Sequence, residues 1–424
     1  MKSKVDSQQE ESNTDNDFSE MSDTQVRRRG PSPKKVVSKN KLPNLERNVP
    51  IIIKNNNFVV RTIWTIVMIL GFMGVLWAGH IYIIGLVLLV NIGIFKEILG
   101  LKRNYEKELN VKYSSLINWY FFGIATFFCY GKLFQSKLSE YAFKMNMLSF
   151  ILNYHNIITF MLWVAGFLIF TLSLKKGYYR YQFRMFGWTH ITLILVVAQS
   201  SVMIMNIFEG IVWFILPCSL VITNDIFAYI FGVSFGKTPL IELSPKKTWE
   251  GFIGGCFSTL IASFCFAYVL QGSQYLTCPQ HQLPFSPFAS LTCEIPSVFI
   301  STQRQLPFSI FGFDSIYFSD FQIHAMVFSL FTSLVSPFGG FFASGFKRGI
   351  KIKDFGDTIP GHGGITDRMD CQILTGMFSY LYLHQIVLPK AVTLGTVLGY
   401  VSQLSTNQQQ ELFNQLKQTL QIGQ

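Results

Sequence analysis

Residues 185–232 read MFGWTHITLILVVAQSSVMIMNIFEGIVWFILPCSLVITNDIFAYIFG, and they contain two apolar runs that meet at Glu209 and Gly210. Each run is long enough to cross the hydrocarbon core of a bilayer, for which an α-helix needs about 20 residues. The short break predicts a tight hairpin of two membrane helices. Asp225 lies late in the second run, where an ionisable side chain costs at least ~2.5 kcal/mol and therefore indicates function. A structural carboxylate that pairs with a nearby Lys is the alternative.

Similar apolar runs recur on both sides of this hairpin. Of the 424 residues, 50% are hydrophobic, 16% aromatic and only 14% charged, whereas about a quarter of the residues in a soluble protein are charged. We therefore predict an all-α, polytopic transmembrane fold with about nine spans. The predicted spans are 58–79, 81–97, 114–131, 152–173, 185–207, 210–232, 252–271, 321–343 and 371–389.

The two ends of the chain differ from this membrane domain. Residues 1–56 are acidic up to Thr24 and basic from Gln25 onward, and they have too little apolar surface to offset the entropy of ordering, so a disordered cytosolic tail is predicted. The basic half either rests on anionic lipid or only fixes topology. Residues 57–390 are predicted to form the membrane domain, and 391–424 an amphipathic segment with no assigned role.

The distribution of Lys and Arg predicts which loops face the cytosol. With a cytosolic N-terminus, the outer loop 272–320 contains only Arg304, and the basic residues gather in the inner loops 98–113, 174–184, 233–251 and 344–370. This follows the positive-inside rule, although loop 132–151 breaks it. The layout places Cys278 and Cys293 in the lumen, where a disulfide between them is plausible but not required. The net charge of +11 does not indicate nucleic-acid binding, because no basic soluble domain carries it.

Two of the inner loops carry clusters of polar residues. Loop 233–251 holds Lys246 and Lys247, and residues 344–370 read SGFKRGIKIKDFGDTIPGHGGITDRMD. Carboxylates are the oxygen ligands that suit Mg²⁺ beside substrate phosphates, Lys and Arg donate to phosphate oxygens, and a glycine-rich turn lets backbone N–H groups approach a phosphate. A purely topogenic loop would not explain four Asp among the basic residues. For His362 itself, a contact to phosphate and a plain turn histidine both stay open.

These loops resemble the CDP-diacylglycerol synthase family, in particular its eukaryotic branch. The family signature runs Ser-x2-Lys-Arg-x4-Lys-Asp-x-Gly-x2-(Ile/Leu/Phe)-(Pro/Gly)-x-His-Gly-Gly-x-x-Asp-Arg-x-Asp, and the stretch from Ser344 to Gln372, SGFKRGIKIKDFGDTIPGHGGITDRMDCQ, is similar at every fixed position. NDIFAYIFGVSFGKTPLIELSPKKTWEGFIGG, from Asn224 to Gly255, resembles the other well-marked segment of the family. By the layout of its spans, the resemblance covers roughly residues 58–390.

The resemblance implies a phosphatidate cytidylyltransferase, in which a phosphate oxygen of phosphatidate attacks the α-phosphorus of CTP and pyrophosphate leaves. Its cofactor would be Mg²⁺, as one ion, as two, or as one with a second cation. Carried over residue by residue, it implies catalytic roles for His362, Asp367, Arg368 and Asp370; substrate or phosphate contacts from Lys246, Lys247, Ser344, Lys347, Arg348, Lys353, Gly363 and Gly364; and metal ligation by Asp225, Asp354, Asp367 and Asp370.

The expected partners are CTP, phosphatidate and the lipid bilayer, in the endoplasmic reticulum or a related endomembrane, with the active site facing the cytosol. A homodimer is left open. One alternative is a different membrane nucleotidyl- or phosphotransferase that acts on a lipid phosphate, since it would share the cationic loops. The other is a transporter, but transporters bind substrate near the bilayer midplane, often between internal repeats. Here the polar cluster lies at one membrane face and no repeat is evident.

Overall fold

The computed structural model describes residues 51–101, 103, 108, 110–111, 113–137, 146–244, 246–280, 293–310, 313–388, 401 and 404–422. Nearly all of the predicted tail, 1–56, lies outside these residues, as does most of the weak apolar stretch at 391–404. Residues Asn56–Gln424 form one compact unit, and the account below concerns this unit.

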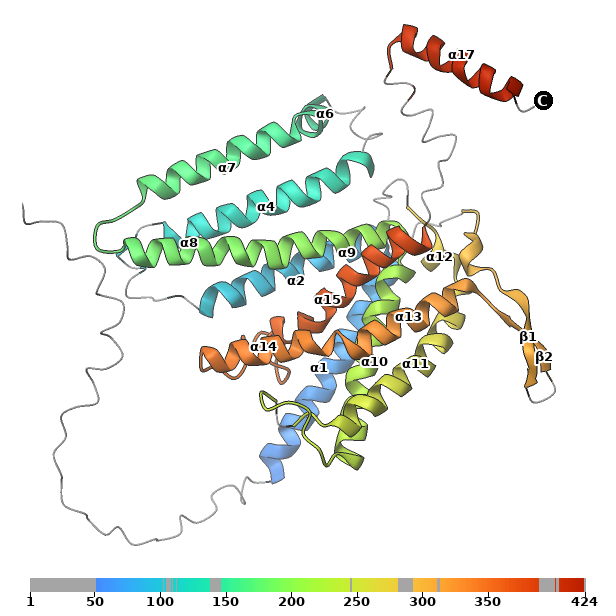
Figure 1. The fold of residues 1–424 in the computed structure, drawn as a ribbon. Helices are drawn as coiled ribbons and strands as arrows, with labels where there is room; N and C mark the ends of the chain where they lie inside the picture. The colour runs from blue at the N-terminus through green and yellow to red at the C-terminus, as the bar shows by residue number, and fades with distance from the viewer. Residues whose placement is uncertain are drawn as a thin grey trace, which may run out of the picture. The chain divides into compact units, whose positions relative to one another are not determined.

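The described chain is almost entirely helical (Figure 1). Its helices are α1 (Ile51–Ala78), α2 (His80–Leu101), α4 (Ser114–Lys137), α6 (Asn146–Asn153), α7 (His155–Leu172), α8 (Tyr179–Leu193), α9 (Gln199–Phe208), α10 (Val212–Phe235), α11 (Trp249–Gln271), α12 (Gln274–Thr277), α13 (Asp320–Leu334), α14 (Pro337–Gly349), α15 (Thr366–Tyr382) and α17 (Thr406–Ile422). A π-helical turn at Ile194–Ala198 joins α8 to α9, and another, Leu383–Val387, extends α15. The predicted amphipathic C-terminal segment contains α17.

Seven helices in the described part of the chain are long and apolar enough to cross a membrane. They are Val59–Ala78, His80–Leu101, His155–Leu172, Tyr179–Phe208, Val212–Phe235, Trp249–Gln271 and Asp320–Gly349. A polytopic membrane protein is therefore confirmed, whereas the count of about nine is not. The two further predicted spans, 114–131 and 371–389, coincide with helices α4 and α15, which are not among the seven.

The hairpin predicted from residues 185–232 is present and turns at Gly210. This glycine has φ +136°, in the region that side chains disfavour. A Cβ at Gly210 would also lie 3.2 Å from the carbonyl oxygens of Leu276 and Thr277. The turn between α9 and α10 is thus pressed against α12, and only glycine fits there.

Helices α10, α11, α13 and α15 pack against one another as a group, with α11 on its outer side (Figure 1). Trp213, Phe321 and Phe328 are buried there almost completely, and Trp213 contacts each of the two phenylalanine rings edge to face. Small polar residues such as Thr259 and Ser263 are fully buried on the same helices. In a membrane bundle, small residues let helix backbones approach closely, which replaces the hydrophobic driving force available in water.

Helix α1 packs much less closely on the bundle than these four helices do, and most of its described apolar side chains are exposed. The hydroxyl of Tyr275 donates to the carbonyl oxygens of Leu76 and Trp77 at one end of α1. Near the middle of the helix, Thr65 lies beside the loop before α15. Hydrogen bonds at its C-terminal end and near its middle therefore join α1 to the bundle.

The predicted outer loop contains the main departure from an all-α fold. Strands β1 (Thr302–Ile310) and β2 (Phe313–Phe318) form an antiparallel hairpin, with an irregular register between Gln305 and Ile310. Pro307 lies in this irregular stretch, and proline cannot donate to a regular ladder. In the same loop, Cys278 and Cys293 form a disulfide with a Cα–Cα distance of 5.9 Å.

Candidate active site at the charged end of the bundle

Two carboxylates from distant parts of the sequence meet at one end of the helices. Asp225 lies in the second half of α10 and is exposed, and Asp370 lies in the first turns of α15. Asp370 interacts electrostatically with Asp225 and with Lys347. Asp225 interacts with Lys247, from the loop before α11, and with Arg368. The two polar loops predicted to lie on one face are therefore brought together.

Glycines let the helices that carry these carboxylates pack closely. A Cβ at Gly255 of α11 would lie 3.1 Å from Oδ1 of Asn224, the residue before the exposed carboxylate on α10. That oxygen also accepts from the Thr259 hydroxyl. A Cβ at Gly340 of α14 would lie 3.5 Å from Oδ2 of Asp370. Small residues thus let α11 pack closely against α10, and α14 against α15.

Asp367 has a different environment from Asp225 and Asp370. Its Oδ1 accepts from Lys347 Nζ at 2.6 Å, and its Oδ2 accepts from the backbone N–H of Phe355 at 2.9 Å. Lys347 Nζ also lies 5.4 Å from the centre of the Phe355 ring. Both carboxylate oxygens of Asp367 therefore hold the loop in place in this structure.

The glycine-rich run before α15 forms a tight turn, with Gly361 at φ +77° and Gly363 at φ +82°. The ring of His362 does not point to the carboxylates: its Nε2 lies 3.2 Å from the hydroxyl of Thr65 on α1. The carbonyl oxygen of His362 accepts from the Arg368 guanidinium at 2.9 Å. Arg368 therefore links the turn at His362 with Asp225, because its positive charge interacts with the Asp225 carboxylate.

The sequence reasoning missed one buried carboxylate, that of Glu97 near the end of α2. Its side chain is 8% exposed, and it accepts hydrogen bonds from the hydroxyls of Thr358 and Thr366 and from the backbone N–H groups of Ile365 and Thr366. The only signal in the sequence is an acidic residue at the end of an apolar run, which also fits a side chain at the headgroup level.

The other predicted residues lie in the same loops. Lys247 Nζ is 5.7 Å from the centre of the Phe341 ring, and a Cβ at Gly363 would be 3.8 Å from Asp354 Cγ. Ser344 is partly buried and Gly364 buried, whereas the side chains of Lys246, Arg348, Lys353 and Asp354 are exposed. Among the described residues, no hydrogen bond or ion pair joins these four exposed side chains to Asp225 or Asp370.

The donor set bears on whether a metal ion fits. Within the described residues there is no group of three or more His, Cys, Asp or Glu side chains placed to hold an ion. The four carboxylates predicted as ligands thus do not form a single cage, in part because Asp367 is bound to Lys347 and Phe355. The pair Asp225 and Asp370 remains, and Mg²⁺ in nucleotide sites is commonly held by one or two carboxylates, waters and substrate phosphates. The two carboxylates are thus the ligand type and number that suit Mg²⁺ bound together with a nucleotide.

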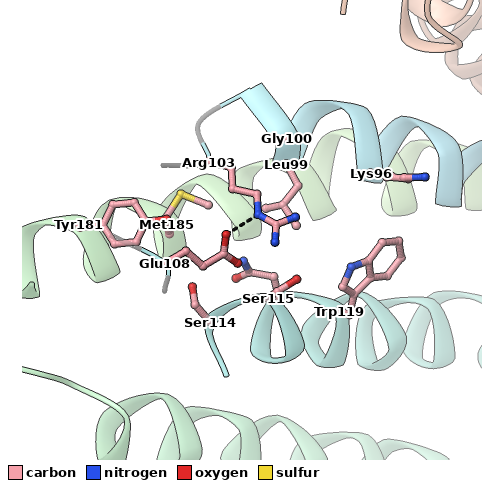
Figure 2. Close-up of a pocket in the computed structure, with 11 residues that line it drawn as sticks. Lys96, Leu99, Gly100, Arg103, Glu108, Ser114, Ser115, Trp119, Tyr181 and Met185 are labelled. Atoms are coloured by element: carbon pink, nitrogen blue, oxygen red, sulfur yellow. Dashed lines mark hydrogen bonds and ion pairs between the residues drawn. The ribbon is translucent and has the colours of Figure 1, made fainter. Parts of the chain in front are cut away.

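A cavity between α2, α4 and α8 lies outside this cluster (Figure 2). It has a volume of about 50 Å³ and is lined by Lys96, Trp119 and Tyr181, among others. Arg103 and Glu108 form an ion pair at its edge. This volume holds a few water molecules and not a nucleotide, so the charged loops remain the candidate site.

Comparisons with known proteins show the family of the chain. The model of the cytidylyltransferase family matches residues 59–386. Phosphatidate cytidylyltransferase 1 of Arabidopsis thaliana is 44% identical over 383 residues, which cover 88% of this chain and 90% of the relative. Phosphatidate cytidylyltransferase of Saccharomyces cerevisiae is 44% identical over 352 residues (81% and 76%). Phosphatidate cytidylyltransferase 1 of Homo sapiens is 42% identical over 365 residues (85% and 78%).

The family match includes Glu97, Asp225, the glycine-rich turn and Asp370, so every part of the site lies within it. The chain therefore belongs to the cytidylyltransferase family.

Proposed function

We propose that this protein is a phosphatidate cytidylyltransferase: it transfers CMP from CTP to phosphatidate and releases CDP-diacylglycerol and pyrophosphate. The observation that carries the proposal is the meeting of Asp225, Lys247, Arg368 and Asp370 at one end of a membrane bundle. A site for two phosphate-bearing substrates must neutralise both, and cations beside a pair of carboxylates that can hold a metal ion provide that chemistry. The names of the relatives supply the lipid and the nucleotide.

In the reaction, a phosphate oxygen of phosphatidate forms a bond to the α-phosphorus of CTP, and the bond from that phosphorus to the bridging oxygen of pyrophosphate breaks. The attacking oxygen is already ionised at neutral pH, so no general base is needed. Lys247 and Arg368 bind phosphate oxygens and reduce the repulsion between the two polyanions. Holding the two substrates in line is the main contribution of the protein.

Asp225 and Asp370 are the proposed ligands of Mg²⁺. The ion, when bound, supplies Lewis-acid polarisation of the phosphates and compensates the charge of the leaving group. Lys246, Arg348 and Lys353 are exposed in the same loops and contact substrate phosphates in this proposal. Asp354, also exposed there, would meet a phosphate only through a metal ion. Gly364 is buried against Glu97, so a direct substrate contact is proposed only for its neighbour Gly363. Lys347 and Asp367 act as a pair that fixes the loop, which modifies the direct roles expected from the sequence.

The charged end is proposed to face the cytosol of an endomembrane such as the endoplasmic reticulum. The basic inner loops favour this orientation through the positive-inside rule. The disulfide between Cys278 and Cys293 lies in the opposite loop and fits an oxidising lumen.

Purified protein in lipid nanodiscs, with labelled CTP, Mg²⁺ and phosphatidate, tests the function. We expect labelled CDP-diacylglycerol and an equal amount of pyrophosphate. Replacing phosphatidate with dolichol, or with another lipid phosphate, distinguishes the related transferases. A protein that consumes CTP only with one of those other acceptors, or that moves a solute without forming any CDP-lipid, would contradict the proposal.

A further inference from the structure

Glu97 on α2 is bound to the loop that precedes α15, more than 250 residues later in the chain. Oε1 accepts from the Thr358 hydroxyl and from Ile365 N–H at 2.9 Å. Oε2 accepts from Thr366 N–H at 2.9 Å and from the Thr366 hydroxyl at 2.7 Å. The side chain is 8% exposed. A carboxylate buried to this degree is stable only when its oxygens are satisfied, and here four donors satisfy them.

These contacts cap the start of α15. The residue at its N-cap position, Ile365, has no side chain that can accept a hydrogen bond, so the helix lacks a cap of its own. Glu97 accepts from the N–H groups of Ile365 and Thr366 instead. A negative charge at a helix N-terminus also interacts favourably with the helix dipole. The cap of α15 thus comes from α2.

The loop is also shaped to close around this carboxylate. A Cβ at Gly356 would lie 2.8 Å from Glu97 Oε1, and a Cβ at Gly364 would lie 2.8 Å from Oε2. Because they have no side chain, Gly356 and Gly364 leave room for the Glu97 carboxylate. This packing is independent of the hydrogen bonds, and it places the carboxylate between the two halves of the loop.

The first turn of α15 carries the groups proposed to bind substrate. Thr366, bound twice by Glu97, is followed by Asp367 and Arg368, and Asp370 lies one helical turn further on. A shift at the start of α15 therefore moves Arg368 and Asp370 relative to Asp225 on α10. Misplacing reacting groups by about 1 Å can cost about 100-fold in rate.

We propose that Glu97 is a positioning residue of the transferase, which holds residues 354–366 and the first turn of α15 so that Arg368 and Asp370 face Asp225. The catalytic part of this inference rests on the proposed function. Glu97 does not contact substrate in this arrangement, because both of its oxygens are occupied by donors from the loop and the side chain is buried.

The test compares Glu97→Gln with Lys96→Gln, which changes the adjacent residue to the same side chain. Lys96 is exposed and lines the separate cavity between α2 and α8. In Glu97→Gln, the amide N–H₂ group would face one backbone N–H, which loses its acceptor, and one hydroxyl, which would have to accept instead of donate. The negative charge at the start of α15 is also removed. We expect kcat per folded enzyme to fall about 100-fold, with KM for CTP changed less than about 3-fold. Lys96→Gln should keep the wild-type kcat.

Hydrogen exchange measured by mass spectrometry gives a readout that needs no substrate. Glu97→Gln should exchange faster in peptides from residues 353–366, while peptides from α10 and α13 keep the wild-type rate. Faster exchange spread equally over α2, α10 and α13 would indicate a general loss of stability and would overturn the inference. If the wild type lacked cytidylyltransferase activity, the proposed function would fail, yet the exchange result would still stand.

A double-mutant cycle with Thr366 provides the second arm, and its Thr366 single variants can be compared even if Glu97→Gln folds poorly. Thr366→Val removes one hydroxyl bond to Glu97, whereas Thr366→Ser keeps it. We expect Thr366→Val to lower kcat about 10-fold and Thr366→Ser to restore it. In the double variant the loss should match that of Glu97→Gln alone, because interacting residues are not additive. Additive losses, or an unchanged kcat in both single variants, would contradict a shared positioning role.

Discussion

At the scale of single residues, the carboxylates of the site fall into two groups. Glu97 and Asp367 are engaged on both oxygens by loop donors and by Lys347. Asp225 is exposed, and Asp370 lies beside it within electrostatic range. The same side-chain chemistry thus serves two purposes, and the partners of each oxygen distinguish them. One group holds the loop, and the other is the one proposed to bind the metal ion beside the substrates.

This difference predicts distinct responses to magnesium. Asp225→Asn and Asp367→Asn should each lower turnover by about 100-fold, because one loses a proposed ligand and the other loses the Lys347 pair. Only Asp225→Asn should raise the Mg²⁺ concentration needed for half-maximal activity. A titration of activity against Mg²⁺ measures this directly, with Lys96→Gln as the reference variant. An unchanged Mg²⁺ requirement in Asp225→Asn would remove that residue from the proposed metal site.

A functional role could be predicted from the sequence for Asp225, but not for Glu97. An acidic residue inside an apolar run is costly in a membrane, so Asp225 attracts attention without a structure. Glu97 sits at the end of a run beside Lys96, where charge is ordinary. Its donors follow more than 250 residues later, and no local pattern predicts contacts at that separation.

At the scale of secondary-structure elements, the helices that carry the site depend on close crossings. Helix α14 packs against the start of α15 at Gly339 and Gly340. A Cβ at Gly339 would lie only 2.7 Å from the backbone oxygen of Asp370. Backbone atoms cannot rotate away from such a contact, so a side chain there would separate the two helices.

We therefore expect Gly339→Ala to destabilise the protein by about 1–3 kcal/mol, the usual cost of overpacking, and to lower turnover. Gly349→Ala is the matched control, because it lies on the same helix with nothing within 4 Å of the new Cβ. Thermal unfolding of both variants in detergent, followed by assay of the folded fraction, makes the comparison. Equal unfolding temperatures for the two variants would show that the α14–α15 crossing tolerates a methyl group.

The apolar runs predicted elements well, and the exceptions have physical reasons. Seven predicted spans correspond to helices that meet the length and hydropathy of a membrane span. Helix α15 begins with TDRMDCQ, so its polar first turns lower its hydropathy even though it packs within the bundle. The hairpin of β1 and β2 was not predicted, because its strands lie in a loop between membrane spans and β1 contains Pro307, which is unusual inside a strand.

At the scale of the whole molecule, the two ends of the bundle differ in chemistry. One end carries the charged loops with Lys247, Arg368 and the carboxylates. The loop with the disulfide Cys278–Cys293 follows α11 at that helix's other end. The sequence predicted this division from the positions of Lys and Arg alone, since charge in loops sets orientation during insertion. The meeting of the two charged loops at one end agrees with it.

Labelling of sealed endomembrane vesicles with a membrane-impermeant maleimide tests the orientation. A Lys246→Cys variant should react in intact vesicles, because this side chain is exposed at the charged end. In Cys278→Ser, the released Cys293 should react only after the vesicles are permeabilised. Cys293 serves as the internal control for vesicle integrity. Labelling of Cys293 in intact vesicles, with Lys246→Cys protected, would reverse the proposed topology.

The sparse packing of α1 has a consequence for the whole assembly. Its hydrogen bonds to the bundle include those from Tyr275 at its C-terminal end and the Thr65–His362 contact near its middle, and most of its described apolar side chains are exposed. A helix seated in this way tilts to match the hydrocarbon thickness around it. A membrane composition that changes the tilt of α1 therefore also changes the position of the turn at His362, which Thr65 of α1 contacts.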